Sequence, residues 1–236
     1  MILASHLTIK NNMKIGIINL YTENYKSMAE LTLPGKQQYA QKHGYILFNK
    51  DDNFVPNVHI GTQKCYYIVE LMEQHPDIDW FWHSGTDCLI TNHNTKLESL
   101  IDSDPSIHFI VCKDDQGINA DVFFIRNSPE GKEYMQHLTT PHQESGTEQG
   151  WMWEDEHTPK WRSITKYIPQ YIMNAYDLSF YPHKSGIDAF NKRGNWEHGD
   201  FLLHAVTGYL PGVALGSKTL YDWKMNILQL HVNDVI

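Results

Sequence analysis

The chain has 236 residues, of which 41% are hydrophobic and 20% charged, and its formal net charge is −9. This length allows one sizeable hydrophobic core in one or two domains. The negative charge and the lack of a basic cluster exclude a nucleic-acid groove, which needs lysine and arginine to displace phosphate counterions. No run of 18 apolar residues and no signal peptide is visible, so we expect no membrane span and a cytoplasmic location, although a viral or microbial enzyme or an excised domain fits as well.

The cysteines and aromatic residues restrict the class further. Cys65, Cys88 and Cys112 are widely spaced in apolar segments without a CxxC motif, which predicts buried free thiols rather than a disulfide framework. Aromatic residues make up 12% of the chain. That content is typical either of an aromatic core or of a sugar-binding cleft, and composition alone does not choose between them.

Apolar runs in the first half of the chain predict buried strands. The expected strands cover residues 14–20, 45–48, the aromatic run 79–83 that leads into Asp87, 108–112 and 119–127. Residues 1–12 precede the first strand and are expected to be a loose extension.

Helices are expected between these strands. The first runs toward His43, is broken by Pro34-Gly35 and stops at Gly44. Another covers residues 62–75, and a third covers residues 129–138, where Pro129 suits the first helical position.

The second half of the chain is less regular. Residues 139–160 are polar, and the C-terminal third has short apolar pieces with turns at Gly186 and Gly194. No linker or internal repeat is visible, so we expect one domain over residues 1–236. Early alternation of strands and helices predicts an α/β fold whose later part builds an acceptor side.

Asp87 is the leading candidate for a functional residue. The apolar run ends at Ser84-Gly85-Thr86, presents one carboxylate at position 87 and then resumes. A buried strand that ends at an acid is a common way to hold a divalent metal on a nucleotide diphosphate. Taken alone, however, the pattern favours a turn cap, because a metal site needs further ligands.

The end of the first predicted strand is a second candidate region. Asn19, Tyr21, Thr22 and Tyr25 lie where this strand leads into a helix. In open α/β sheets ligands bind at the carboxyl ends of strands, so these residues are candidates for contacts with a nucleotide cofactor.

Several motifs occur in one order along the chain. They are Lys64, His75-Pro76-Asp77-Ile78-Asp79-Trp80, Gly85-Thr86-Asp87, the strand Asn119–Asn127, Glu148-Gln149, and Gly199-Asp200-Phe201-Leu202-Leu203-His204. Together they resemble the galactosyl, xylosyl and mannosyl transferase family that includes yeast galactomannan galactosyltransferases and plant xyloglucan xylosyltransferases. No single motif is specific, but order and spacing agree from about residue 14 to about residue 210.

The resemblance implies the GT-A fold, an α/β fold with a single mixed central sheet flanked by helices. It implies a nucleotide-sugar donor, with a UDP-sugar expected, and a glycan or glycoprotein acceptor. It also implies a divalent metal, usually Mn²⁺ or else Mg²⁺, and retention of the anomeric configuration. The expected protein is thus a metal-dependent retaining glycosyltransferase.

The resemblance also implies roles for individual residues. Asp87 corresponds to the last Asp of a DxD metal motif, and His204 to a second metal ligand. The implied catalytic group comprises Gln149, near the anomeric carbon, its neighbour Glu148, and Lys64, toward the diphosphate or the acceptor. The further implied cofactor-binding residues are Thr86, Asn119, Asp121 and Asp200.

Two positions depart from the family pattern. Gly85 stands where the family has the first Asp of DxD, and Asp121 stands where a glycine is common. Gly85 fits a dispensable carboxylate, a turn with positive φ, or a need for space beside the donor, and the sequence leaves these alternatives open.

Two other functions remain open. One is a catalytically impaired GT-A-like protein that binds a nucleotide sugar or carbohydrate. The other is a nucleotidylyltransferase, which is disfavoured because residues 19–25 contain neither the glycine nor the basic residue of the usual N-terminal loop.

Overall fold

The structure is a computed structural model that describes residues 13–140, 147–181, 184–206 and 217–236. The expected N-terminal extension, residues 1–12, lies outside the described residues. No helix in the described ranges is long and apolar enough to cross a membrane.

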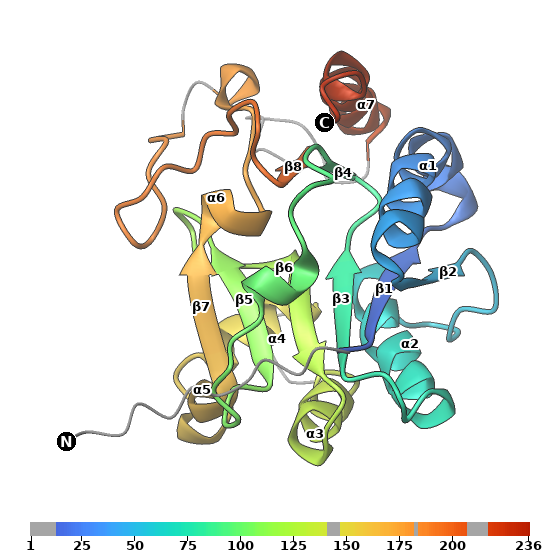
Figure 1. The fold of residues 1–236 in the computed structure, drawn as a ribbon, viewed down its shortest axis with the longest axis vertical. Helices are drawn as coiled ribbons and strands as arrows, with labels where there is room; N and C mark the ends of the chain where they lie inside the picture. Colours follow the sequence, from blue (N-terminus) through green and yellow to red (C-terminus); the bar gives the residue numbers. More distant parts are fainter. Residues whose placement is uncertain (1–12, 141–146, 182–183, 207–216) are drawn as a thin grey trace.

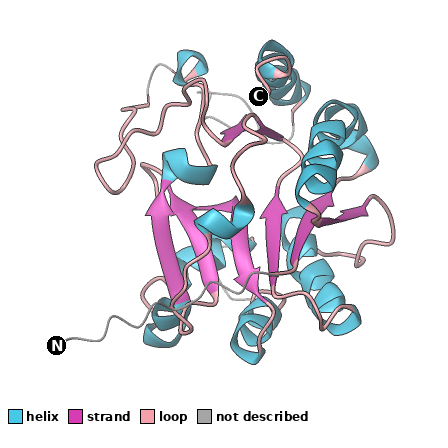
Figure 2. Ribbon diagram, viewed as in Figure 1, coloured by secondary structure: helices cyan, strands magenta, loops and turns pink. Residues whose placement is uncertain are grey.

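A six-stranded mixed sheet forms the centre of the molecule (Figures 1 and 2). Its strands lie in the order β2-β1-β3-β6-β5-β7, and β6 is antiparallel to both of its neighbours. The strands are β1 (Ile15–Leu20), β2 (Ile46–Lys50), β3 (Trp80–Ser84), β5 (Phe109–Lys113), β6 (Ile118–Arg126) and β7 (Thr165–Pro169). The predicted mixed central sheet is therefore confirmed, with β7 as a strand that the sequence analysis missed.

Helices and short 3-10 turns flank this sheet (Figure 1). The helices are α1 (Lys26–His43), α2 (Ile60–Gln74), α3 (Pro129–His137), α4 (Glu148–Asp155), α5 (Pro159–Ile164), α6 (Gln170–Met173) and α7 (Lys218–His231). The 3-10 turns are η1 (Glu23–Tyr25), η2 (Leu97–Leu100) and η3 (Leu178–Phe180). Helix α3 begins as predicted, with Pro129 in its first turn and the Ser128 hydroxyl accepting from the amide of Gly131.

The alternation of side chains along the strands separates the core into two layers. Phe81 and Phe123 face one layer, which α2, α3 and α4 cover. Trp82 and Phe124 face the other, which α1, α6 and the segment around Phe201 cover. All three cysteines are buried free thiols, so that prediction is confirmed.

Helix α1 corrects one prediction. The helix continues through Pro34, which was expected to break it, and ends at Gly44 with a φ of 77°. Pro34 removes one backbone donor, but Pro34 and Glu30, whose carbonyl loses its partner, are both exposed to water. The buried stripe of Met28, Thr32 and Tyr39 holds the two halves of the helix in line.

Three elements near the carboxyl edge of the sheet were not predicted. Strands β4 (Cys88–Ile90) and β8 (Leu202–His204) form a small antiparallel sheet in which Cys88 lies opposite His204. Helix α7 packs beside α1, and its N-cap Ser217 accepts from the amide of Leu220. These elements bring the C-terminal part of the chain to the end of β3.

Candidate functional site

The ends of β3, β6 and β8 bring three side chains together. After β3 the chain turns at Gly85, whose amide donates to the carbonyl of Asp121 at 2.8 Å. The Nε2 atom of His204 lies 3.4 Å from Oδ2 of Asp87 and 3.7 Å from Oδ2 of Asp121. Asp87, Asp121 and His204 thus converge, although they are far apart in the sequence.

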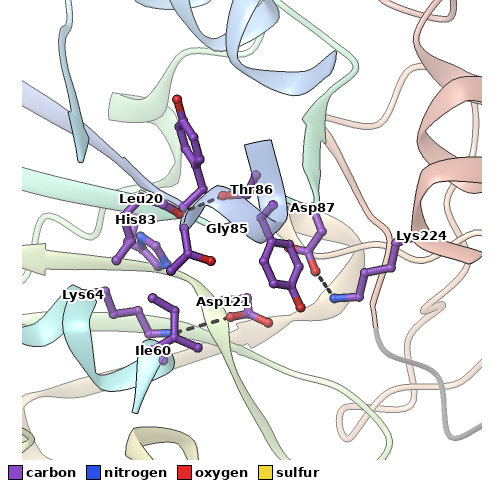
Figure 3. Close-up of a pocket in the computed structure, with 13 residues that line it drawn as sticks. Leu20, Ile60, Lys64, His83, Gly85, Thr86, Asp87, Asp121 and Lys224 are labelled. Atoms are coloured by element: carbon purple, nitrogen blue, oxygen red, sulfur yellow. Dashed lines mark hydrogen bonds and ion pairs between the residues drawn. The ribbon is translucent and has the colours of Figure 1, made fainter. Parts of the chain in front are cut away.

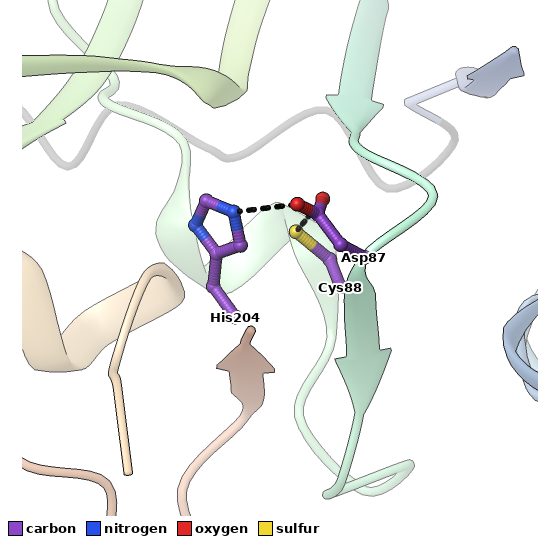
Figure 4. Close-up of side chains that lie close together, drawn as sticks. All are labelled: Asp87, Cys88 and His204. Atoms are coloured by element: carbon purple, nitrogen blue, oxygen red, sulfur yellow. Dashed lines mark hydrogen bonds and ion pairs between the residues drawn. The ribbon is translucent and has the colours of Figure 1, made fainter. Parts of the chain in front are cut away.

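The two ring nitrogens of His204 have different surroundings. Its Nδ1 lies 2.7 Å from Oδ1 of Asn174, whereas its buried Nε2 has no hydrogen-bond partner among the described residues. Figure 4 shows this nitrogen facing the carboxylate of Asp87. Because an amide oxygen accepts, Nδ1 carries a hydrogen, and Nε2 is the ring nitrogen that faces the two carboxylates. Such an arrangement fits a cation between them.

Cys88 completes the potential metal-binding group but differs from the other two residues. One ligand atom each from Asp87, Cys88 and His204 lies within 4.8 Å of the others. Burial raises the pKa of the Cys88 thiol well above its usual value, and its sulfur lies 3.9 Å from Oδ1 of Asp87. The protonated thiol therefore donates to Asp87, and the ligands that fit a metal are the carboxylate and the imidazole.

Lys224 on α7 forms an ion pair with Asp87 that the sequence analysis missed. The ammonium contacts Oδ2 of the carboxylate, and both side chains are buried. Burial opposes the ionisation of Asp87, but Lys224, and after it His204, outweigh burial and hold the pKa of Asp87 well below its usual range. Asp87 is therefore a carboxylate, and an ammonium already compensates part of its charge.

An open pocket with a cavity volume of about 160 Å³ lies in front of these residues (Figure 3). Of the residues singled out from the sequence, those that line it are Tyr21, Thr22, Tyr25, Lys64, Gly85, Thr86, Asp87 and Asp121. The structure therefore brings the loop after β1 and the turn after β3 to the same pocket.

The floor of the pocket holds a second set of paired charges. Lys64 lies 2.8 Å from Oε1 of Glu148 and 3.4 Å from Oδ1 of Asp121. Burial lowers the pKa of Lys64, but the two carboxylates outweigh it and the pKa is raised. Lys64 is therefore an ammonium shared between α4 and β6.

Gln149 lies at the same edge, outside the lining of the pocket. Its Oε1 accepts from the amide of Ala120 at 3.1 Å, next to Asp121. The bond fixes the carbonyl end of the side chain and leaves the amide NH₂ as the end available to a substrate.

Three of the other predicted residues have structural partners. Asn19 is buried and bonds to Asn49 and Lys36, and Asn119 donates to the hydroxyl of Tyr176. Asp200 accepts two bonds of 2.6 Å from Arg193. The structure does not bring Asn19, Asn119 and Asp200 into the lining of the pocket.

Lys36 is a buried lysine behind the turn that carries Asp87. Its Nζ donates to Oδ1 of Asn19 at 2.8 Å and to the carbonyls of Ser84 and Gly85 at 2.8 and 2.7 Å. Burial lowers the pKa of Lys36 to about 8. The sequence signal for Lys36 is a lysine four residues after buried Thr32, on the inward stripe of α1.

The fold identifies the class of protein. A glycosyltransferase involved in glycosylation of the major capsid of PBCV-1 superposes with a TM-score of 0.65 at 16% identity, covering 92% of this chain and 99% of that one. The glycosyltransferase GlyE of Streptococcus pneumoniae superposes with a TM-score of 0.55 at 14% identity, covering 94% and 63%. The chain thus has the GT-A glycosyltransferase fold, as predicted.

Sequence comparison shows similarity to one family over part of the chain. Residues 13–105 match the model of the galactosyl transferase GMA12/MNN10 family. An uncharacterized alpha-1,2-galactosyltransferase of Schizosaccharomyces pombe is 22% identical over 82% of this chain and 67% of its own length. The probable alpha-1,6-mannosyltransferase MNN10 of Saccharomyces cerevisiae is 21% identical over 68% of this chain and 51% of its own length. The predicted resemblance is confirmed, and the chain is a glycosyltransferase.

Proposed function

We propose that the protein is a metal-dependent retaining glycosyltransferase that moves a sugar from a UDP-sugar to a glycan or glycoprotein acceptor. The observation that carries the metal dependence is the convergence of His204 Nε2 and the carboxylate of Asp87, which lie 3.4 Å apart. Carboxylate and imidazole together suit Mn²⁺, with Mg²⁺ as a second choice. Asp87 and His204 would hold the ion, which would stabilise the leaving diphosphate as a Lewis acid.

The residues of the pocket have distinct proposed roles. Tyr21, Thr22, Tyr25 and Thr86 line the side that receives the nucleotide. The ammonium groups of Lys64 and Lys224 add positive charge near the diphosphate. Such preorganised charges stabilise negative charge that develops in the transition state.

The donor proposal is tested by calorimetry with UDP in the presence of Mn²⁺ and with excess chelator. Asp87 and His204 supply only two ligands, so phosphate oxygens must complete the coordination of the ion. We therefore expect UDP and Mn²⁺ to bind cooperatively. Equal UDP affinity in chelator would contradict the metal-dependent site.

The reaction itself is tested with a UDP-sugar and a glycan acceptor. Release of UDP, together with an anomeric configuration in the product equal to that of the donor, supports retaining transfer. Donor binding without product in a screen of acceptors would favour the binding-only alternative. Release of pyrophosphate would indicate a nucleotidylyltransferase.

Lys224→Met tests whether the ammonium of Lys224 and a metal ion share the carboxylate of Asp87. Without Mn²⁺ the buried carboxylate of Asp87 loses its partner, so we expect the free energy of unfolding to fall by about 2 kcal/mol. Saturating Mn²⁺ should stabilise this variant more than the wild type, because the ion replaces the lost charge. Thermal unfolding with and without Mn²⁺ measures both effects.

Lys218→Met is the matched control on the same helix. Lys218 is exposed and, in the part of the chain that the structure describes, pairs with Asp222 on the same helix, so neither effect is expected there. If Mn²⁺ stabilises Lys224→Met no more than the wild type, Lys224 and the ion do not share Asp87.

Gln149→Ala tests the catalytic amide. If the amide acts on the transition state, kcat should fall about 100-fold while the Kd of the donor changes little. Gln149→Glu is the matched variant, because a carboxylate still accepts from the amide of Ala120. Loss of turnover in both variants supports a role for the NH₂ group, whereas loss in the alanine variant alone means that Gln149 only anchors β6.

A further inference from the structure

A buried hydrogen-bond network lies behind His204. It consists of Asp114, Asn119, Asn174 and Tyr176, which we call the Tyr176 network, and all four side chains are buried. The Tyr176 hydroxyl donates to Oδ2 of Asp114 at 2.7 Å. It also lies 3.2 Å from Nδ2 of Asn119 and 3.3 Å from Nδ2 of Asn174. One hydroxyl therefore joins three side chains from separate parts of the chain.

The carboxylate of Asp114, which accepts hydrogen bonds, sets which groups donate and which accept in this network. Its Oδ1 already accepts from the amides of Gln116 and Gly117, so Oδ2 remains for Tyr176. An ionised carboxylate only accepts hydrogen bonds, so the hydroxyl of Tyr176 must donate to it. The hydroxyl then has only lone pairs left for its other two partners.

The direction of the hydrogen bonds at Tyr176 also sets the orientation of Asn174 toward the imidazole of His204. Because the hydroxyl accepts from Asn174, the NH₂ group of Asn174 must point toward Tyr176 and its Oδ1 toward His204. The amide oxygen accepts, so Nδ1 of His204 carries a hydrogen, which leaves Nε2 as the nitrogen that a metal ion would bind. Among the described residues Nε2 has no hydrogen-bond partner, and it faces the carboxylates of Asp87 and Asp121.

The same hydroxyl also reaches the other side of the site. Asn119 donates to Tyr176, and its Oδ1 accepts from the amide of Asp121 at 3.0 Å. The ring of Tyr176 packs edge-on against the ring of His204, with centroids 5.6 Å apart. Tyr176 is thus in contact with His204 and tied to the backbone of Asp121.

We propose that Tyr176 and Asn174 are positioning residues, which hold His204 in the tautomer and orientation that a metal ion requires. This inference rests on the proposed metal-dependent function, because His204 is its ligand. Partners of a ligating histidine that fix its tautomer commonly change metal affinity 10- to 100-fold when they are removed. The residues of the Tyr176 network that fix His204 lie in the segment after α6, in β6 and in the turn after β5.

Tyr176→Phe tests the proposal with two measurements. The ¹⁵N shifts of the His204 ring in metal-free protein, assigned with a His204→Asn variant, report which nitrogen carries the hydrogen. We expect hydrogen on Nδ1 in the wild type and a mixture of tautomers in Tyr176→Phe. Mn²⁺ affinity in the presence of UDP, measured by the electron paramagnetic resonance of free Mn²⁺, should fall roughly 10- to 100-fold.

Tyr39→Phe is the matched control. It removes the hydroxyl of another fully buried tyrosine. Tyr39 belongs to α1, and its hydroxyl donates to the carbonyl of Thr95. Tyr39→Phe should leave both the tautomer and Mn²⁺ affinity unchanged. An equal loss in both variants would overturn the positioning role, because general destabilisation would explain it.

Asn174 provides a second pair of variants that keeps the proposal testable if Tyr176→Phe does not fold. Asn174→Asp retains an acceptor for Nδ1–H of His204, so hydrogen should stay on Nδ1. Asn174→Leu removes the acceptor and should lose the tautomer preference and the Mn²⁺ affinity. Equal behaviour of these two variants would overturn the proposal.

The outcomes separate this inference from the proposed function. If the wild type has hydrogen on Nδ1 but binds no Mn²⁺ with UDP, the metal-dependent function fails, and with it the purpose of the network. If the wild type binds Mn²⁺ but neither the ring shifts nor the affinity responds to Tyr176→Phe and Asn174→Leu, the function stands and the positioning role is wrong.

Discussion

Replacing Lys36 by methionine should lower the free energy of unfolding by at least about 3 kcal/mol. The side chain is fully buried, and its ammonium donates to Asn19 and to the carbonyls of Ser84 and Gly85. Methionine fills similar space but removes the ammonium donor from three buried acceptors, of which the carbonyl of Gly85 keeps the amide of Cys88. Because two of these acceptors belong to the turn that leads into Asp87, the site should loosen together with the fold.

Chemical denaturation of Lys36→Met measures this loss. The matched control is Lys42→Met on the same helix, where an exposed lysine donates to Oδ1 of Asn94. We expect that control to stay within about 0.5 kcal/mol of the wild type. Equal stability of the two variants would mean that the three acceptors find other donors or water.

Lys36 also predicts a pH dependence. Its pKa is lowered by burial from 10.5 to about 8, so between these values the unfolded chain binds more protons than the folded one. The free energy of unfolding should therefore rise as pH is raised from about 8 to 10.5, by at most about 3 kcal/mol from this group. Other groups titrate in this range, so the prediction concerns the difference between the wild type and Lys36→Met, and a difference that does not change with pH would contradict it.

The centre of the sheet was predictable because β1, β3, β5 and β6 are buried on both faces. Short apolar runs such as the one that begins at Trp80 are typical of strands that are buried on both faces. β7 was missed because Lys166 and Tyr167 interrupt its apolar character at the edge of the sheet. The break expected at Pro34 was wrong, since local propensity yields when a buried stripe holds a helix together.

The site was predictable only in part. Asp87 stands out because a carboxylate ends a buried strand, and His204 was singled out by a motif. Their approach depends on the pairing of β4 with β8, which no local pattern specifies.

The lysines of the site were harder to interpret than its acids. Lys64 was assigned by resemblance, whereas Lys36 and Lys224 were overlooked because lysine is normally an exposed residue. Each of the two has a sequence signal: Lys36 lies four residues after Thr32, and Lys224 lies three before Ile227, on inward stripes of their helices. A lysine on an apolar stripe is therefore a candidate partner for a buried acid or carbonyl, but the partner itself becomes known only from the fold.

Substitution of Gly85 is the second change with a large expected effect. The structure also narrows the three explanations for a glycine at this position. Gly85 is not among the glycines with positive φ, so backbone strain does not require a glycine there. A Cβ at this position would instead lie 2.8 Å from Oδ1 of Asp87, closer than a normal contact. The turn cannot easily move away, because the amide of Gly85 bonds to Asp121 and its carbonyl accepts from Lys36.

We therefore expect Gly85→Ala to fold with a free energy of unfolding lower by about 1–3 kcal/mol, and to lose at least about 10-fold in affinity for UDP with Mn²⁺. Gly85→Asp has the same Cβ and adds a second negative charge beside Asp87, so we expect its affinity to fall as well. Calorimetry with UDP and Mn²⁺ and thermal unfolding without ligand measure the two effects. Gly35→Ala is the matched control, because nothing lies within 4 Å of a Cβ there, and it should keep full affinity. If Gly85→Asp binds UDP with Mn²⁺ more tightly than the wild type, the space beside Asp87 is not what glycine preserves, and the missing first carboxylate of the DxD motif is simply dispensable.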